Sequence, residues 1–154
     1  MQIDLAKIVA SQPATAFGTL ADVADWPQIF RSVTSAELVP PGPIRLGSKV
    51  REHRIFFGRQ GPRELKVAAI DRPRRLCFVV EHPDLHYELD HLFDAVYGGG
   101  CRIMLIFRSR QGTPAGRALQ PLMAPFMGIN LRDELERDLF DLAAAVTRTT
   151  STGT

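Results

Sequence analysis

The apolar residues of this chain follow two different periods. In the last third, from about Leu119 to Val146, they recur at helical spacing. Upstream lie roughly seventy residues of strand-like segments separated by turns rich in Gly and Pro. One long helix after a meander of strands favours a sheet that curls, with the helix along its concave face. Such a curl tends to leave a space between helix and sheet, where many proteins bind a ligand.

The amino-terminal segment predicts one strand and two short helices. Apolar and polar residues alternate from Ile3 to Val9, which predicts the strand. Ser11 is a good helix N-cap, and Pro13 follows in the first turn. A short amphipathic helix is expected around Phe17, and a further helical turn beginning at Trp26 is expected to close one end of the sheet.

The central region predicts a meander of consecutive antiparallel strands joined by short turns. Gly58 to Pro62 is expected to form one of these turns. Together with the first strand, this gives an α+β chain with about seven strands. The expected strands are Val33–Val39, Lys49–Phe57, Arg63–Ile70, Arg75–His82, Leu85–Val96 and Cys101–Arg108.

The long C-terminal helix has two halves of different character. Its second half is a regular amphipath that is expected to end near Val146. Its first half contains Pro121 and Pro125, each of which removes a backbone donor. Either these prolines loosen a Met-rich segment that can repack around variable shapes, or Pro121 marks the true start of the helix. The apolar stripe of the second half consists of Leu131, Leu135, Leu139, Leu142 and Val146.

Composition narrows the class of protein. The 154 residues suit a single domain, expected at 1–147 with a disordered tail at 148–154. No apolar run is long enough to span a membrane, so no stable membrane insertion is expected. The first ten residues lack the form of a secretory signal, which favours a cytoplasmic location. Cys77 and Cys101, isolated in apolar strands, are expected to be buried and reduced.

Charge and motif spacing argue against several chemistries. The net charge is +2 and the basic residues are scattered, so no nucleic-acid surface is expected. Gly98 to Gly100 leads into a strand rather than a helix and lacks the geometry of a phosphate loop. No histidine pair has compact ligand spacing, so the sequence predicts no metal site, and it predicts no cofactor either. The four histidines are His53, His82, His86 and His91.

Strand alternation indicates which side chains face the interior. Along the sixth strand the apolar set contains Tyr87, Leu89 and His91, so this set should point inward. Tyr87 and His91 then place polar atoms on an otherwise apolar wall. A single buried histidine is more often satisfied by a neighbouring backbone group than used as a base, although both roles are known. The matching inward residues on the neighbouring strands are Leu76, Phe78, Val80, Cys101, Ile103, Leu105 and Phe107.

The inward face of the third strand has two possible assignments. Pairing through a two-residue turn at Pro83-Asp84 places Val50, Glu52, Arg54 and Phe56 inside, and this assignment is favoured. Glu52 and Arg54 then form an internal ion pair, or Arg54 anchors a ligand carboxylate or enolate. A β-bulge would instead place His53, Ile55 and Phe57 inside.

Four local patterns resemble motifs of one known family. They are Phe17 with Leu20, Asp22 and Trp26-Pro27; Gly47 with Val50; Asp71-Arg72-Pro73-Arg74-Arg75-Leu76; and Gly99-Gly100-Cys101-Arg102-Ile103. Together with the order of elements, they resemble the START-like, or Bet v 1-like (SRPBCC), superfamily and its polyketide cyclase/dehydrase-type branch. The resemblance covers essentially the whole chain. It implies the helix-grip fold, in which a curved antiparallel sheet wraps a long C-terminal helix after two short helices.

The resemblance implies binding of a small hydrophobic molecule, such as a lipid, polyketide or aromatic compound, by a monomer or homodimer. An alternative is an aromatase/cyclase or dehydratase that uses His91, Tyr87 and Arg54 for acid–base and oxyanion chemistry. A second alternative is a protein-interaction module, because Met104 and Ile106 fall on the outward face of the last strand. The cavity is expected to measure a few hundred Å³. Its expected ligand-binding residues are Arg54, Phe56, Phe78, Tyr87, Leu89, His91, Phe126, Met127 and Asn130.

Overall fold

A computed structural model describes most of the chain. The backbone is described for residues 1–56, 59–82, 85–110 and 114–152, and the side chains for residues 1–55, 60–81, 86–110 and 131–150. The predicted site residues Phe56, Phe126, Met127 and Asn130 therefore lie outside the described side chains.

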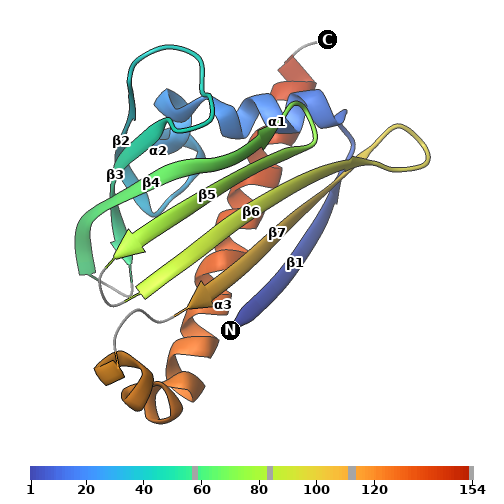
Figure 1. The fold of residues 1–154 in the computed structure, drawn as a ribbon. Helices are drawn as coiled ribbons and strands as arrows, with labels where there is room; N and C mark the ends of the chain where they lie inside the picture. The colour runs from blue at the N-terminus through green and yellow to red at the C-terminus, as the bar shows by residue number, and fades with distance from the viewer. Residues whose placement is uncertain (57–58, 83–84, 111–113, 153–154) are drawn as a thin grey trace.

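The strands form one seven-stranded antiparallel sheet in the order β1-β7-β6-β5-β4-β3-β2 (Figure 1). Neighbours in sequence from β2 to β7 are also neighbours in the sheet, as expected for strands joined by short turns. The strands are β1 (Gln2–Val9), β2 (Val33–Val39), β3 (Lys49–Phe56), β4 (Arg59–Asp71), β5 (Arg75–His82), β6 (Leu85–Ala95) and β7 (Cys101–Arg110). The α+β meander predicted from the sequence is confirmed.

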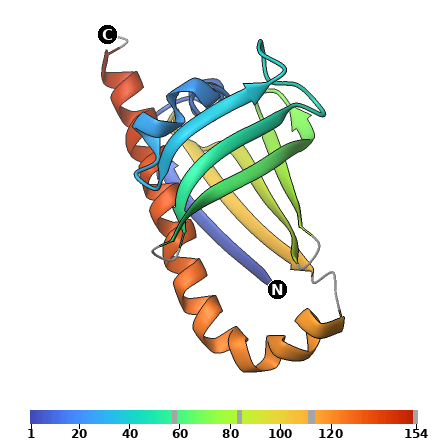
Figure 2. The same ribbon diagram turned by 90° about the vertical axis from the view of Figure 1, so that its left-hand side faces the viewer.

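The helices follow the predicted order. After β1 come α1 (Pro13–Ala21), the 3₁₀ turn η1 (Val23–Asp25) and α2 (Trp26–Ile29). The long helix α3 (Pro114–Thr152) ends the described chain. Figure 2 shows the sheet curving around the side on which α3 lies, with α1 and α2 at one end. This arrangement is the helix-grip fold.

Three details of the strands and helices differ from the sequence prediction. Gly58 to Pro62 was expected as a turn, but β4 already begins at Arg59, and Pro62 pairs with His53 in the ladder. Helix α3 continues to Thr152 rather than ending near Val146. Ser11 does not cap α1, because the N-cap residue is Gln12; the Ser11 hydroxyl instead hydrogen-bonds the Thr150 hydroxyl near the end of α3.

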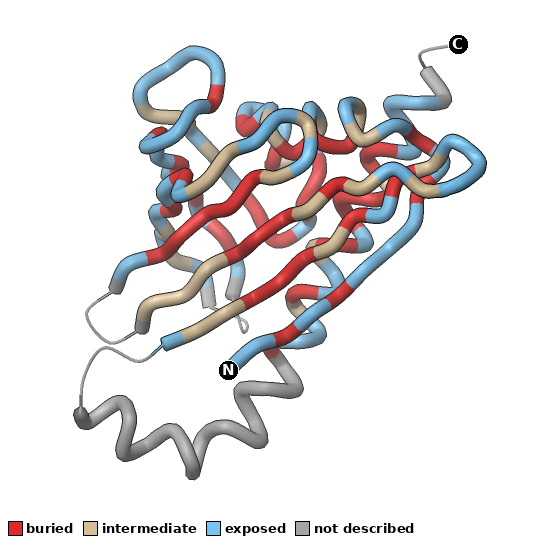
Figure 3. Tube along the Cα trace, turned by 45° about the vertical axis from the view of Figure 1, so that its right-hand side comes forward, coloured by how far each residue is buried: buried red, intermediate tan, exposed pale blue. Residues whose placement is uncertain are grey.

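The apolar core lies between the sheet and the helices. Buried residues occupy much of the length of the central strands (Figure 3). Phe17 of α1 packs edge-to-face on Phe93 of β6, with ring centroids 5.8 Å apart. From α3, Leu142 and Val146 are fully buried in the same cluster. Burial on this scale supplies most of the drive to fold.

Three smaller predictions can also be compared with the structure. Cys77 and Cys101 are free and buried, as expected. Met104 and Ile106 face the outer side of the sheet, where Ile106 is buried and Met104 half-buried. Within the described ranges, no helix is both long and apolar enough to cross a membrane.

Candidate functional site

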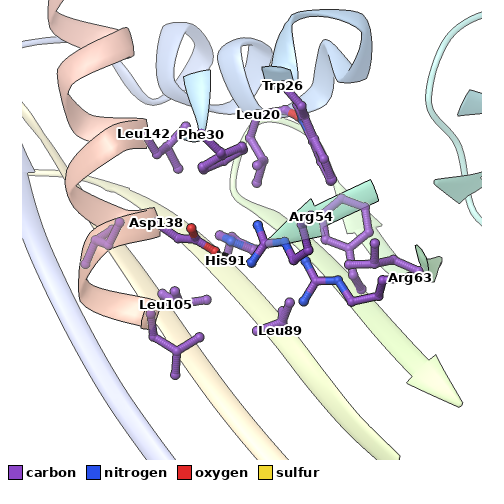
Figure 4. Close-up of a pocket in the computed structure, with 14 residues that line it drawn as sticks. Leu20, Trp26, Phe30, Arg54, Arg63, Leu89, His91, Leu105, Asp138 and Leu142 are labelled. Atoms are coloured by element: carbon purple, nitrogen blue, oxygen red, sulfur yellow. Dashed lines mark hydrogen bonds and ion pairs between the residues drawn. The ribbon is translucent and has the colours of Figure 1, made fainter. Parts of the chain in front are cut away.

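A cavity lies between the middle of the sheet, the end of α1, α2 and the second half of α3 (Figure 4). Its volume is about 30 Å³, which accommodates one or two water molecules. The few hundred Å³ expected from the sequence are not found in this cavity. Its walls are formed by Leu20, Trp26, Phe30, Arg54, Arg63, Leu65, Phe78, Leu89, His91, Leu105, Leu135, Asp138, Leu139 and Leu142.

Most of the cavity wall is apolar and held in place by aromatic contacts. Trp26 packs edge-to-face on both Phe30 and Phe78, with centroid distances of 5.7 and 5.6 Å. Its indole N–H donates to the Leu20 carbonyl at 2.9 Å, so the one polar atom of the ring is satisfied by the backbone. The wall around Trp26 therefore offers contact surface without exposing a polar group.

The polar part of the wall comes from two neighbouring strands. On β3, Glu52 and Arg54 are 1% and 4% exposed, whereas His53 and Ile55 are exposed to solvent. The inward assignment favoured from the sequence is therefore confirmed for Glu52 and Arg54. Arg63 of β4 stands directly opposite Glu52 in the ladder, and its guanidinium forms an ion pair with the Glu52 carboxylate.

Arg63 and Asp138 complete this cluster, and both were missed from the sequence. Asp138 projects from α3 within the stripe of leucines, and its Oδ2 accepts a hydrogen bond from Arg54 Nη1 at 3.0 Å. Figure 4 shows these two side chains meeting across the cavity. The sequence did contain a signal for Asp138. It lies four residues before Leu142, so the two side chains share one face of the helix. Arg63 lies in the interior of β4, which begins at Arg59, and the pairing of β3 with β4 sets it opposite Glu52.

Two cavity-lining side chains carry buried polar atoms without a hydrogen-bond partner among the described residues. These atoms are Arg54 Nε and Asp138 Oδ1. Arg54 Nε lies 3.1 Å from Glu52 Oε1, close enough for an ion pair but not aligned for a hydrogen bond. Leaving such atoms unsatisfied costs about 1–3 kcal/mol each. Both atoms are therefore available to hydrogen-bond a water molecule or a polar group of a ligand in the cavity.

His91 lies on the same wall, on β6. Its Nδ1 is 3.3 Å from the Leu76 carbonyl oxygen. Because a carbonyl only accepts, the proton of the neutral ring is on Nδ1 and Nε2 carries the lone pair. Burial lowers the pKa of His91 to about 4, so the ring is neutral at pH 7. This agrees with the expectation that desolvation keeps it uncharged.

Tyr87 faces the interior as expected but does not reach the cavity. Its hydroxyl accepts a hydrogen bond from Arg63 Nη1 at 3.3 Å, and its ring lies against Phe107 with centroids 5.4 Å apart. Tyr87 is half-buried and is not part of the cavity wall. It therefore reaches the site only through Arg63. Of the other predicted binding residues, Arg54, Phe78, Leu89 and His91 all line the cavity.

The electrostatics of the cluster keep the Arg63 guanidinium charged. Burial alone would lower the pKa of Arg63, but the adjacent Glu52 carboxylate outweighs it and raises that pKa above its usual value. Two carboxylates, Glu52 and Asp138, thus face two guanidinium groups. No group of three or more metal-ligating side chains occurs within the described part of the chain. The arrangement suits binding of an organic molecule with one polar group at the cluster.

Solved structures with the same architecture have very different sequences. The Zhui aromatase/cyclase from Streptomyces sp. R1128 superposes with a TM-score of 0.81 at 15% identity, covering 97% of this chain and 95% of that one. The protein TTHA0849 from Thermus thermophilus gives 0.78 at 17% identity, covering 97% and 99%. A START superfamily protein from Mycobacterium smegmatis gives 0.74 at 13% identity, covering 99% of each chain. At these identities the likeness establishes the fold alone.

The sequence itself carries the family assignment. No curated protein sequence matches the chain significantly. The model of one protein family, however, matches residues 2–147, which is nearly the whole chain. That span includes every strand and the part of α3 that supplies Asp138. The chain therefore belongs to the family described as polyketide cyclase / dehydrase and lipid transport.

Proposed function

We propose that this protein binds a small, mainly hydrophobic molecule in the cavity between the sheet and α3. The observation that supports the proposal is the distribution of apolar and polar side chains in the cavity wall. Among the described residues the wall is apolar over most of its extent, with its polar side chains gathered in the cluster of Arg54, Arg63, His91 and Asp138. Ligand sites commonly combine an apolar lining with a few convergent polar groups that fix orientation. The description of the family, which includes lipid transport as well as cyclases, supports the same class of ligand.

The small volume implies that the cavity widens when a ligand enters. Across the cavity, α3 is joined to β3 by the Arg54–Asp138 ion pair and otherwise presents leucine side chains. Leucine contacts are not directional, so this part of α3 can adjust its position on the sheet, within the limit set by the ion pair that joins Asp141, one turn further on, to Arg31. A ligand that replaces these contacts with its own apolar surface compensates for the displacement. We therefore expect binding to be accompanied by movement of α3 relative to β3.

The test uses a cavity-filling substitution with a matched control. Leu89→Phe adds volume to the wall, whereas Leu92→Phe makes the same change on the outer face of the same strand. Calorimetric titration of 2-naphthol should show binding to the wild type and to Leu92→Phe. Leu89→Phe should weaken it by about tenfold or more, because excess volume in a packed interior is not tolerated. Circular dichroism should verify that both variants fold. Equal binding by all three proteins would disprove the cavity as the site.

Trp26 provides a second readout. It is the only tryptophan of the chain and it lines the cavity. A ligand that enters should change the emission of this indole, because it replaces water or leucine contacts at the ring. Titration with 1-decanol, which does not absorb near the tryptophan emission, should shift or quench the signal. The same titration of Leu89→Phe should show a smaller change at equal concentration.

The second candidate function is catalysis of an aromatase/cyclase or dehydratase type. Neutral His91 and cationic Arg54 line one cavity, and this observation favours it. His91 Nε2 would remove a proton from a carbon between two carbonyls, while Arg54 stabilises the enolate oxygen that forms. A pKa near 4 makes His91 a weak base at pH 7, which is why binding is the first choice.

His91→Ala separates the two functions. For an enzyme acting on a poly-β-ketone, turnover should fall by roughly 10²-fold while the affinity changes little. For a carrier, only the affinity should change, by the ~1 kcal/mol of one neutral hydrogen bond. His53→Ala, on the exposed face of β3, is the control for a histidine that faces solvent.

A further inference from the structure

The unpartnered atoms of the cavity specify the chemistry of the group that meets them. Arg54 Nε is a donor and Asp138 Oδ1 is an acceptor, and neither has a hydrogen-bond partner among the described residues. Arg54 is only 4% exposed, so its Nε cannot be satisfied by bulk water. A ligand group that satisfies both atoms must accept one hydrogen bond and donate another.

The charge of the cluster restricts the group further. Arg54 and Arg63 are balanced by Glu52 and Asp138, which are joined to them by ion pairs. The formal charge of the four side chains is therefore zero. A ligand carboxylate would add an uncompensated negative charge beside Asp138 in a buried site, and such a charge is strongly disfavoured. It would also leave Asp138 Oδ1 without a donor, because a carboxylate only accepts.

We infer that the ligand presents a neutral hydroxyl group to the Arg54–Asp138 pair and that the site discriminates against carboxylates. The inference rests on the proposed binding function and names the head group that this function requires. A hydroxyl is the smallest organic group that can accept from Arg54 Nε and donate to Asp138 Oδ1. Asp138 thus acts as the specificity-determining residue, because its carboxylate both accepts a hydrogen bond from the hydroxyl and repels an anion.

The test compares three probes that differ only in the head group. They are 2-naphthol, naphthalene and 2-naphthoate, titrated calorimetrically at pH 7 into the wild-type protein. We expect 2-naphthol to bind at least ~10-fold more tightly than naphthalene, as a hydrogen bond to a charged group predicts. The carboxylate 2-naphthoate should bind more weakly than 2-naphthol by a similar or larger factor.

Asp138→Asn should reverse this preference. The substitution removes one negative charge, so Arg54 loses its counter-ion on α3 and can pair with a ligand carboxylate. We expect 2-naphthoate to gain about tenfold in affinity and 2-naphthol to lose a similar factor. Asp133→Asn makes the same change of charge at an exposed position of α3 and should leave both affinities unchanged.

A second variant keeps the inference testable if Asp138→Asn does not fold. Arg54→Lys retains the positive charge but removes the Nε–H donor, so the advantage of 2-naphthol over naphthalene should shrink by several-fold. Stronger binding of 2-naphthoate than of 2-naphthol by the wild type would overturn the inference and leave the proposed function intact. Equal binding of 2-naphthol and naphthalene would also overturn it, since water would then satisfy both atoms. Absence of binding by all three probes would reject the proposed function itself.

Discussion

The interior of this protein has two regions that share the same sheet and the same helix but differ in chemistry. Around Phe17, Phe93 and Val146, the space between helix and sheet is filled by buried apolar side chains. A few turns away, around Glu52 and Asp138, it contains ion pairs, a cavity, and polar atoms that have no hydrogen-bond partner among the described residues. Close packing stabilises a fold, whereas incompletely satisfied buried polar groups lower its stability. The first region therefore stabilises the helix-grip fold. The second lowers that stability, and its polar groups are placed to recognise a ligand.

The largest expected effect tests the packed region. Phe93→Ala removes a ring that is 1% exposed and packs on Phe17, so the unfolding free energy should fall by about 3–5 kcal/mol. Phe93 does not line the cavity, so the folded fraction should bind 2-naphthol with unchanged affinity. Urea denaturation and calorimetry measure the two quantities.

Phe140→Ala is the control for this substitution, because Phe140 lies on α3 but is half-exposed. It should cause a far smaller loss of stability. A comparable loss of unfolding free energy in both variants, or a loss of affinity for 2-naphthol in Phe93→Ala, would contradict the division between the two regions.

The next effect tests the polar region and uses two carboxylates from one pair of strands. Glu52 faces Arg63 on the inner side of β3 and β4, and Glu64 faces Arg51 on the outer side in the adjacent register position. Their side chains are 0% and 48% exposed. Glu52→Gln should lower the unfolding free energy by about 3 kcal/mol, because it leaves buried arginines without their partner. Glu64→Gln should cost less than about 1 kcal/mol, as is usual for exposed ion pairs. Equal losses in urea denaturation would contradict the assignment of Glu52 as a structural counter-ion.

A third effect concerns His91 and pH. The pKa of His91 falls from 6.5 in the unfolded chain to about 4 in the folded protein, because burial disfavours the charged ring. The unfolded chain therefore binds the proton first as the pH falls below 6.5. Stability that is present above pH 6.5 is lost as the pH falls toward 4. Between pH 7 and pH 5 the loss from this residue should be about 2 kcal/mol.

The measurement is the difference in unfolding free energy between pH 7 and pH 5. His91→Gln should remove about that share of the loss, whereas His53→Gln, on the exposed face of β3, should retain all of it. An unchanged pH dependence in His91→Gln would mean that the folded protein can protonate the ring at little cost, and would reopen its role as an acid–base group.

The two regions also differ in how far the sequence predicts them. Alternation along β6 and β7 identifies the inward residues, because a buried sheet face leaves a clear period of two. The same rule placed Glu52 and Arg54 inside, although both are charged, since register transmits the inward face from strand to strand. Periodicity alone cannot reveal an interaction between distant elements. Asp138 was therefore not connected with Arg54, which lies on another element and meets it only in the folded chain.

Local signals failed where tertiary pairing overrides them. Gly61-Pro62 is typical of a turn, but in the structure both residues continue β4, where Gly61 pairs with Arg54 and Pro62 with His53. Ser11 is a favourable N-cap by type, but its hydroxyl binds Thr150 of α3 instead. The cavity volume was also overestimated, because sequence patterns identify which side chains point inward but not how completely they fill the space.

The smallest expected effect defines the edge of the polar region. Tyr87→Phe removes the hydroxyl that accepts from Arg63 Nη1 but keeps the ring that packs on Phe107. The unfolding free energy should fall by about 1 kcal/mol, the net value of one hydrogen bond. Because Tyr87 lies outside the cavity wall, the affinity for 2-naphthol should stay within about twofold, since only the support of Arg63 is altered. Tyr97→Phe, at a fully exposed position, should change neither quantity. A tenfold loss of affinity in Tyr87→Phe would show that the binding site extends beyond Arg63. Tyr87 would then be a ligand-binding residue and not only a support for Arg63.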